Sequence, residues 1–350
     1  MLERYTDAIL RTPIDLPEPY RWGRSRAGRP LPAFRFGGGS LRLSLIAGCH
    51  ADEPTGPRLL RQLVSWLAAQ PADHPLLTRY RWHIVPHANP DGEAVNRRWY
   101  EEDTETYDLA RYLHGVDRAL PREDIEFGFP IEGEIGPKRP ENAFLYKCWT
   151  DFGGQFHLHA SLHSMAFAFG AWFLIDPNWV ERAQLLQRQC CRVAQSMGYP
   201  LHDVDRKGEK GFHRIGPGFA TRPNHRAMRQ FFLDRDDPEM AAFFHPSSME
   251  SVAALGEECL TLVSELPAFI LPRRTADLSW PNPEFDDWMA RIHGWKAQLQ
   301  LGESSDAEVN AAARAAGIRP MPVRDQMRLQ WTLVGAGAAL AAEQAEQEQE

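Results

Sequence analysis

Several features that would assign the chain to a familiar class are missing from its sequence. No apolar run approaches the roughly 18 to 20 residues that a membrane-spanning helix needs. The first seven residues contain no basic segment followed by an apolar one, so no secretory signal is visible. The formal net charge is −8 and the isoelectric point is near 5.9. This acidic balance argues against binding to nucleic acid or to an anionic membrane.

Cysteine is scarce, and its positions do not suit a disulfide framework. The five cysteines are Cys49, Cys148, Cys190, Cys191 and Cys259. Their number is odd, two are adjacent, and none forms a Cys-x-x-Cys pair, which favours reduced and mostly buried thiols. Together with the missing signal and membrane segments, this pattern predicts a cytoplasmic protein.

The composition allows a large folded core. Of the 350 residues, 43% are hydrophobic and 11% aromatic, enough for one large α/β domain or a domain with a small appendage. We predict a main domain over residues 1–275 and a C-terminal helical extension over residues 276–350. The Ala-, Glu- and Gln-rich end of this extension is expected to be a solvated helix end or a disordered tail. The sequence does not determine the oligomeric state.

Hydrophobic periodicity predicts alternating strands and helices. Strands are expected at residues 33–36, 41–49, 80–85, 156–162, 171–176 and 259–266. Helices are expected after Pro54, at 140–149, from a cap at Asn178 to Gly198, at 248–256 and at 283–301. Residues 199–240 show weak periodicity and are expected to form an irregular or lid region. This order indicates an α/β fold with a mixed, mostly parallel sheet sandwiched by helices.

The stretch that ends the strand at 41–49 contains a candidate metal site. This buried strand stops at His50, and a turn through Glu53 leads into a helix. Side chains at the carboxyl end of such a strand face the usual ligand crevice of an α/β sheet. An imidazole and a carboxylate at this spacing can bind one Zn²⁺ and leave room for a third ligand and a water. His-x-x-Glu alone is common, however, and also fits a capping carboxylate and a surface histidine. Cys49 should point to the other face of the strand.

Three further polar residues lie at or just past the ends of other predicted strands. These residues are Asn89, His163 and Glu265, and parallel strand ends converge on one crevice. His163 is the best third zinc ligand, ahead of His157 and His159, which lie deeper in the same strand. Glu265 is suited to take the proton of a metal-activated water and pass it to the leaving amine.

The long segment that follows Asn89 supplies candidate substrate contacts. It is rich in glycine, proline and charge, and loops of this length in compact domains are usually functional. Arg98, Arg118 and Arg122 lie in it, and the planar guanidinium group binds both oxygens of a carboxylate. Most arginines are solvated surface residues, so each of these remains a candidate, together with Asn89.

Four sequence blocks, in their order, resemble the signature of the zinc carboxypeptidase A family. They are His50 to Gly56, Asn89 to Gly92 followed by Arg98, Ser161 to Ser164, and Ser264 to Pro267. In addition, Gly23 to Leu31 is similar to the N-terminal Gly-x-Ser-x-x-Gly-Arg-Pro-Leu element of that family. The resemblance covers roughly residues 20–270.

The resemblance implies an α/β zinc metallocarboxypeptidase with one Zn²⁺ per chain. The ligands would be His50, Glu53 and His163, Glu265 would be the general base and acid, and Arg98 would contact the substrate. The expected reaction is cleavage of an amide bond next to a free carboxylate in a small peptide, as in a carboxypeptidase or a murein peptide amidase. Alternatives are an N-acyl amino-acid deacylase similar to aspartoacylase and succinylglutamate desuccinylase, and a non-catalytic peptide-binding protein.

Two departures from the family pattern leave the substrate open. The Asn-Arg pair that clamps a terminal carboxylate is not found, because neither Arg118 nor Arg122 has an asparagine beside it and Asn96-Arg97 comes too early. The mobile tyrosine expected before the general base is also missing, and residues 243–245 (Phe-Phe-His) occupy that neighbourhood.

Overall fold

The computed structural model describes residues 2–131, 139–256 and 258–347. Within these residues ten strands form one sheet. The strands are β1 (Arg21–Arg24), β2 (Pro30–Phe36), β3 (Leu41–Ala47), β4 (Tyr80–Val85), β5 (Leu158–Ala168), β6 (Trp172–Ile175), β7 (Arg214–Gly216), β8 (Phe219–Thr221), β9 (Leu260–Ile270) and β10 (Arg319–Pro320).

The sheet has a parallel centre and antiparallel edges. Its strand order is β1-β2-β4-β3-β5-β9-β6-β8-β7, with β10 paired to β9. Strands β4, β3, β5 and β9 run parallel, whereas β2 pairs antiparallel with β4, and β6 with β9. Parallel strands are covered on both faces and are apolar nearly throughout, as in β3. This is the mixed, mostly parallel sheet that the sequence predicts.

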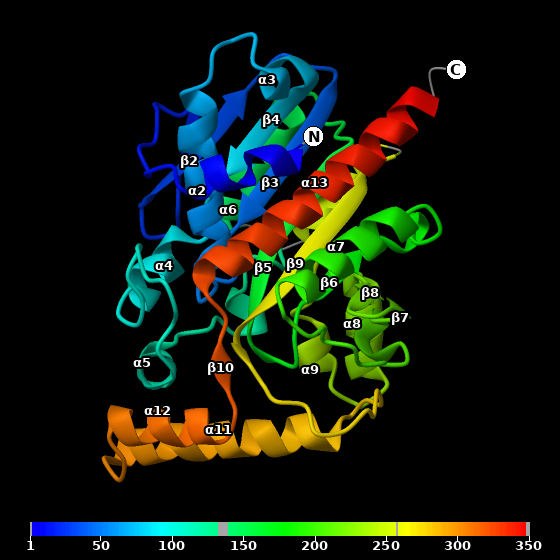
Figure 1. Ribbon diagram of the computed structural model, residues 1–350. Helices are drawn as coiled ribbons and strands as arrows, with labels where there is room; N and C mark the ends of the chain where they lie inside the picture. Colours follow the sequence, from blue (N-terminus) through cyan, green and yellow to red (C-terminus); the bar gives the residue numbers. More distant parts are fainter. Residues whose placement is uncertain (1, 132–138, 257, 348–350) are drawn as a thin grey trace.

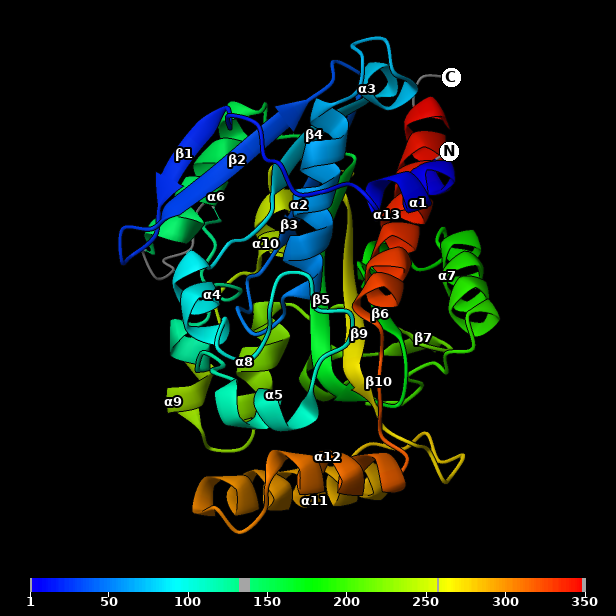
Figure 2. The same ribbon diagram turned by 60° about the vertical axis from the view of Figure 1, so that its left-hand side comes forward.

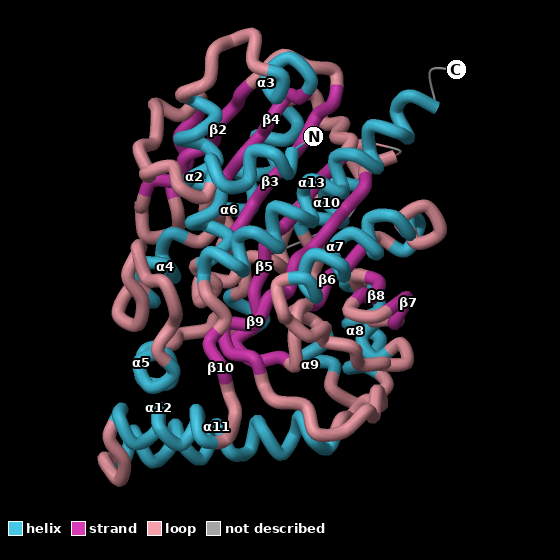
Figure 3. Tube along the Cα trace, viewed as in Figure 1, coloured by secondary structure: helices cyan, strands magenta, loops and turns pink. Residues whose placement is uncertain are grey.

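Helices cover both faces of the sheet (Figures 1 to 3). The α-helices are α1 (Thr6–Ile9), α2 (Thr55–Ala68), α3 (Pro75–Arg79), α4 (Pro90–Asn96), α5 (Leu109–Gly115), α6 (Pro140–Asp151), α7 (Gln184–Ser196), α8 (His225–Leu233), α9 (Pro238–Ala241), α10 (Ser248–Ala253), α11 (Pro283–Leu301), α12 (Asp306–Ala315) and α13 (Val323–Gln347). Short 3₁₀ helices are η1 (Leu2–Tyr5), η2 (Pro121–Glu123), η3 (Pro177–Trp179) and η4 (Glu209–Gly211). Helices α2, α7 and α13 lie on one face, and α6 and α10 lie on the other. Among the described helices, none has both the length and the apolar character needed to cross a membrane.

The C-terminal helix differs from the sequence expectation. Instead of a solvated end, α13 packs along β9, β5 and β3, and its last alanines, including Ala341, Ala342 and Ala345, are buried. Small side chains let the helix lie close to the sheet, and Gly337 sits where a Cβ would come within 2.5 Å of Leu262 Cδ1. Composition alone cannot distinguish such a helix from a tail. The predicted boundary at residue 275 stays a prediction.

Strands β5 and β9 are longer than predicted, and this changes where the candidate residues lie. His163 and Glu265 are inside these eleven-residue strands, not at their ends, and they are partners in register. By contrast, β4 stops at Val85 as predicted, and β3 stops at Ala47, two residues before the predicted end of that strand. The crevice therefore forms where β3 and β4 end while β5 and β9 continue.

Two local expectations are also wrong. The Asp176 side chain accepts from the Asn178 backbone N–H, so Asn178 does not cap the next helix, and α7 begins only at Gln184. Residues 199–240 are more regular than predicted, because they contain β7, β8, α8 and α9. Their apolar residues pack against rings from distant segments, which local periodicity does not reveal.

Candidate metal centre and active site

A tight turn after β3 brings His50 and Glu53 to the same side. Gly48 has a positive φ of 68°, and a Cβ there would come within 2.5 Å of the His87 ring. Only glycine fits this position without displacing the histidine. The turn then closes with a hydrogen bond from the Glu53 N–H to the His50 carbonyl at 3.3 Å. Helix α2 begins two residues later and fixes the turn against the sheet.

Three side chains meet at this turn. His50 Nδ1 lies 2.8 Å from Glu53 Oε1, and His163 Nδ1 lies 3.0 Å from Glu53 Oε2. The two Nδ1 atoms are 3.1 Å apart. The backbone N–H of Ser164 donates to Glu53 Oε2 at 3.1 Å, which fixes the carboxylate. One nitrogen or oxygen from each residue thus converges on one point.

The outer ring nitrogens of both histidines face oxygen atoms. His50 Nε2 lies 3.1 Å from Asp124 Oδ2, and His163 Nε2 lies 2.8 Å from Ser161 Oγ and 3.3 Å from Glu126 Oε2. A neutral histidine that donates from Nε2 presents the lone pair of Nδ1 to the centre. Two such nitrogens and a carboxylate are a common donor set for catalytic zinc. The residues therefore fit a zinc ion.

The charges of Glu53, His50 and His163 strongly affect one another's pKa values. Burial lowers the pKa of His163, but Glu53 and Glu126 together outweigh burial and raise that pKa to about 10. Burial alone would raise the pKa of Glu53. The charges of His50 and His163 outweigh burial and hold this pKa well below its usual range. A metal cation would have to displace protons from the histidines to bind.

A second group of metal-type ligands shares His163. Cys49, Glu126 and His163 also approach one another, on the side of the imidazole opposite Glu53. Burial holds the pKa of the Cys49 thiol well above its usual range, with the Glu126 charge adding to the effect. A protonated thiol is a poor metal ligand, so the group with Glu53 is the better candidate.

Glu265 projects into the same cavity from β9. It pairs in register with His163 across the β5–β9 ladder and lines a cavity of about 150 Å³ with His50 and His163. Burial and then the nearby charge of Glu53 raise the pKa of Glu265 to about 7. A carboxyl group with this pKa can accept and release protons near neutrality.

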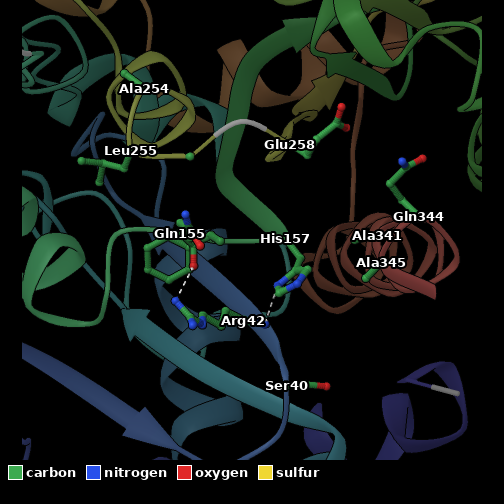
Figure 4. A pocket seen from close by; sticks show the side chains of 12 residues that line it. Ser40, Arg42, Gln155, His157, Ala254, Leu255, Glu258, Ala341, Gln344 and Ala345 are labelled. Carbon is green, nitrogen blue, oxygen red and sulfur yellow. Dashed lines mark hydrogen bonds between the residues drawn. The ribbon is translucent and has the colours of Figure 1, made fainter. Parts of the chain in front are cut away.

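The cavity wall is mainly apolar. Its apolar lining residues include Phe127, Leu174, Phe212, Met228, Met249 and Val263. A larger hollow of about 880 Å³ lies between the starts of β3 and β5 and the end of α13, around Arg42 and His157 (Figure 4). None of the predicted metal ligands lines that hollow, nor does Glu265, so its size does not mark the site of chemistry.

Arg118 reaches the predicted metal ligands from the long segment after α4. Its Nη1 lies 3.2 Å from both Asp52 Oδ2 and Glu53 Oε1, and its Nη2 lies 3.2 Å from His50 Nδ1. The side chain is about half exposed, at 50%. Its guanidinium therefore borders the centre on the solvent side.

The other predicted substrate contacts lie elsewhere. Asn89 caps α4, with its Oδ1 accepting from the Gly92 N–H at 3.0 Å. Arg98 donates to the Gly115 carbonyl at 2.6 Å, and Arg122 is an exposed residue of η2. None of these three belongs to the group around Glu53 or lines the cavity. Their contact with a substrate stays a prediction.

Sequence reasoning missed Asp124 and Glu126, which face the two histidines. Both lie in the segment at 100–140 that its length marked as functional, but they are one of many acidic pairs there. Only the tertiary contacts with His50 and His163 distinguish them.

Comparisons with known proteins find similarity to carboxypeptidases. Residues 2–168 match a family model described as zinc carboxypeptidase. Carboxypeptidase SOL1 of Arabidopsis thaliana is 27% identical over 139 residues, 39% of this chain and only 23% of that protein.

Among solved structures, a metallo-carboxypeptidase from Pseudomonas aeruginosa in complex with (2-guanidinoethylmercapto)succinic acid has 16% identity and a TM-score of 0.42, covering 95% of this chain and 68% of that one. Carboxypeptidase A from Helicoverpa armigera has 14% identity and a TM-score of 0.41, covering 84% and 68%. The match to the zinc carboxypeptidase model over residues 2–168 thus agrees with the resemblance seen in the sequence motifs of the chain.

Proposed function

We propose that the chain is a zinc-dependent hydrolase that cleaves an amide bond next to a free carboxylate in a small peptide. One observation supports this most strongly: His50, Glu53 and His163 converge beside a cavity that Glu265 also lines. Metal ligands and a separate carboxylate are what metal-assisted amide hydrolysis requires.

In this proposal His50, Glu53 and His163 hold one zinc ion. When bound, zinc supplies Lewis acidity to a water and to the amide carbonyl. Asp124 keeps the His50 ring oriented, since it accepts from the outer ring nitrogen. Glu265 takes a proton from the attacking water and delivers it to the leaving nitrogen, for which its pKa near 7 is well placed.

Arg118 is proposed to stabilise the negative charge that develops on the carbonyl oxygen. Its guanidinium borders the metal ligands and is half exposed, so its solvent side can face a substrate. Donors of this kind, aimed at a developing charge in a partly enclosed site, are worth about 10²- to 10³-fold in rate.

Replacement of Glu265 by Gln tests the proposed mechanism. We expect hydrolysis of N-acyl dipeptides to fall by about 10²-fold or more while zinc content stays at one per chain. Rates would be measured by release of the C-terminal residue, and zinc by elemental analysis. Glu258→Gln is a matched control, because Glu258 pairs with Arg182 away from the cavity. A folded, zinc-loaded Glu265→Gln protein with the parent's rate would refute the proposal.

The small cavity also favours a second candidate, an N-acyl amino-acid deacylase. A volume of about 150 Å³ suits a single small group rather than a long peptide. Rates on N-acyl amino acids, compared with rates on dipeptides and γ-linked peptides, would separate the two activities. If none of these is hydrolysed and zinc is substoichiometric, the non-catalytic alternative is favoured.

All five cysteines are free thiols. Free thiols persist in reducing compartments, which supports our proposal that the protein works in the cytoplasm. Fractionation of the native host with an antibody to the chain would test this location.

A further inference from the structure

The proposed substrate carries a carboxylate, yet the described cavity wall offers it no unpaired cation. Arg222 is the arginine that lines the cavity, and its Nη2 lies 2.6 Å from Asp176 Oδ2. Its Nε donates to Thr261 Oγ1 at 2.7 Å. Two of the three guanidinium nitrogens of Arg222 therefore already have partners within the protein. A cation for the substrate must come from a neighbouring element.

Arg206 is held by aromatic rings without an acidic partner. Its guanidinium carbon lies 5.2, 4.6 and 4.5 Å from the ring centroids of Trp172, Phe212 and Trp280. Its Nε is buried and has no hydrogen-bond partner. Among the described residues no carboxylate lies within ion-pair distance of it, and burial lowers its pKa.

Lys210 is a second unpaired cation on the same segment. Its Nζ lies 5.3 and 5.4 Å from the ring centroids of Phe231 and Phe232. No described carboxylate pairs with it, and burial and then the charge of Arg206 lower its pKa despite the opposing charge of Glu209. Two half-buried like charges without counter-ions are unfavourable, and a bound anion would relieve both.

The segment that carries these cations borders the catalytic cavity. Phe212 lines the cavity and packs on Trp172, with ring centroids 5.3 Å apart. Trp172 is in turn the register partner of Glu265 in the β6–β9 ladder. The charges of Glu209 and Glu265 act on Arg206 and oppose the lowering of its pKa, but burial outweighs them. Arg206 thus lies behind one aromatic ring of the cavity wall.

We propose that Arg206, supported by Lys210, binds the carboxylate of the substrate. This inference rests on the proposed hydrolase function and names its specificity residue. A guanidinium stacked between rings is pre-organised for a carboxylate and keeps its edge nitrogens free for two parallel hydrogen bonds. Arg206 would then bind the terminal carboxylate in place of the Asn-Arg pair that is not found in the sequence.

Substitution Arg206→Met tests the proposal with a pair of probes, benzoylglycyl-leucine and its C-terminal amide. We expect KM for the acid to rise about 10- to 100-fold, with kcat nearly unchanged, because charge-assisted hydrogen bonds to the ground state are lost. The ratio of kcat/KM for acid over amide should fall by the same factor. Lys210→Met should cause a smaller change, and Arg206→Lys should restore part of the loss.

The matched control is Arg182→Met. Arg182 also stacks on an aromatic ring, with its guanidinium carbon 4.0 Å from the Trp179 centroid, but it is paired with Glu258 at 3.1 Å. We expect this variant to keep the parent's acid-to-amide ratio. Equal losses on acid and amide in Arg206→Met, or an unchanged ratio, would overturn the proposal.

A measurement without turnover separates this proposal from the hydrolase function. In zinc-free protein, succinate should raise the melting temperature of the parent and of Arg182→Met, but not of Arg206→Met. The Arg206→Met protein itself should be no less stable than the parent, since repulsion from Lys210 is removed. An equal succinate shift in parent and Arg206→Met would refute the carboxylate site. If the parent hydrolyses neither probe but shows the Arg206-dependent shift, only the hydrolase proposal fails.

Discussion

Glu265, the proposed general base and acid, has a buried carboxyl group that reduces the stability of the fold at neutral pH. Because burial and Glu53 raise its pKa to about 7, the folded state binds its proton more tightly than the unfolded chain does. The folded state then holds more protons than the unfolded state between about pH 4.5 and pH 7, so stability falls as pH rises through that range. The role in hydrolysis that we propose for Glu265 would explain why this unfavourable burial is retained.

We therefore expect Glu265→Gln to stabilise the zinc-free protein at pH 8, by on the order of 2 kcal/mol, and to change it little at pH 5. The physical reason is that glutamine is neutral at both pH values, whereas Glu265 must ionise at the higher one. Urea unfolding at the two pH values measures this difference. Equal effects at pH 5 and pH 8 would show that the pKa of Glu265 is not raised.

Asp124 is expected to act on zinc affinity through His50. Removal of its charge in Asp124→Asn weakens the hydrogen bond to the outer ring nitrogen, and changes of this kind usually lower metal affinity about 10- to 100-fold. Competition with a chromophoric chelator measures the affinity. Asp117→Asn is the control, because Asp117 is exposed and lies 3.8 Å from Arg98. An unchanged affinity in Asp124→Asn would assign Asp124 a different role.

At the residue level, the sequence was sufficient to predict which site residues lie together when they are only a few positions apart in the chain. His50 and Glu53 are three residues apart, and a strand followed by a helix already places them together. His163 and Glu265 were singled out because each was placed at the end of a predicted strand, although both strands continue past these residues. Asp124 and Arg206 were not found, since their roles come from contacts with elements far away in the sequence.

Among the elements, the positions of strands and helices were predicted best where turn-forming residues mark the ends of the element. The bounds of β4 agree with the prediction, because Pro86 and the turn after it end the strand. The ends of β5 and β9 were missed, since the residues beyond His163 and Glu265 become strand by pairing with each other, and at the end of β9 with β10, rather than through their own pattern. The burial of α13 was missed for a related reason, because an alanine-rich face becomes buried only when a sheet lies beneath it.

A pair of Gly→Ala substitutions tests the packing of α13. In Gly337→Ala the new Cβ would lie 2.5 Å from Leu262 Cδ1 and 3.2 Å from Leu158 Cδ1, so we expect destabilisation of about 1–3 kcal/mol by overpacking. The matched control is Gly294→Ala in α11, where nothing lies within 4 Å of the added atom. That change should instead stabilise by about 0.5–1 kcal/mol, as for a glycine in an exposed helix. Thermal unfolding of both variants gives the signs, and a neutral or stabilising Gly337→Ala would contradict close packing.

In the molecule as a whole, the proposed active site joins segments from both halves of the chain. The family match ends at residue 168, yet Glu265 and the cations of the proposed carboxylate site come later. The C-terminal helix also reaches the centre, where Gln330 Nε2 donates to the His163 carbonyl at 3.2 Å and lies 3.3 Å from Ser264 Oγ. The predicted extension and the predicted catalytic domain are thus linked by contacts close to the chemistry.

Truncation after residue 275 tests whether the first segment can stand as a domain. The cut removes Met327, Leu329, Trp331, Leu333 and Val334 of α13, all of which are buried. Burial of five such side chains contributes roughly 8–15 kcal/mol, which is comparable to the whole stability of a typical protein. We therefore expect the 1–275 fragment to be insoluble or to lack cooperative unfolding and zinc binding, whereas a chain ending at Gln347 should behave like the parent. A soluble fragment that binds one zinc and unfolds cooperatively would contradict this expectation and support the boundary at residue 275.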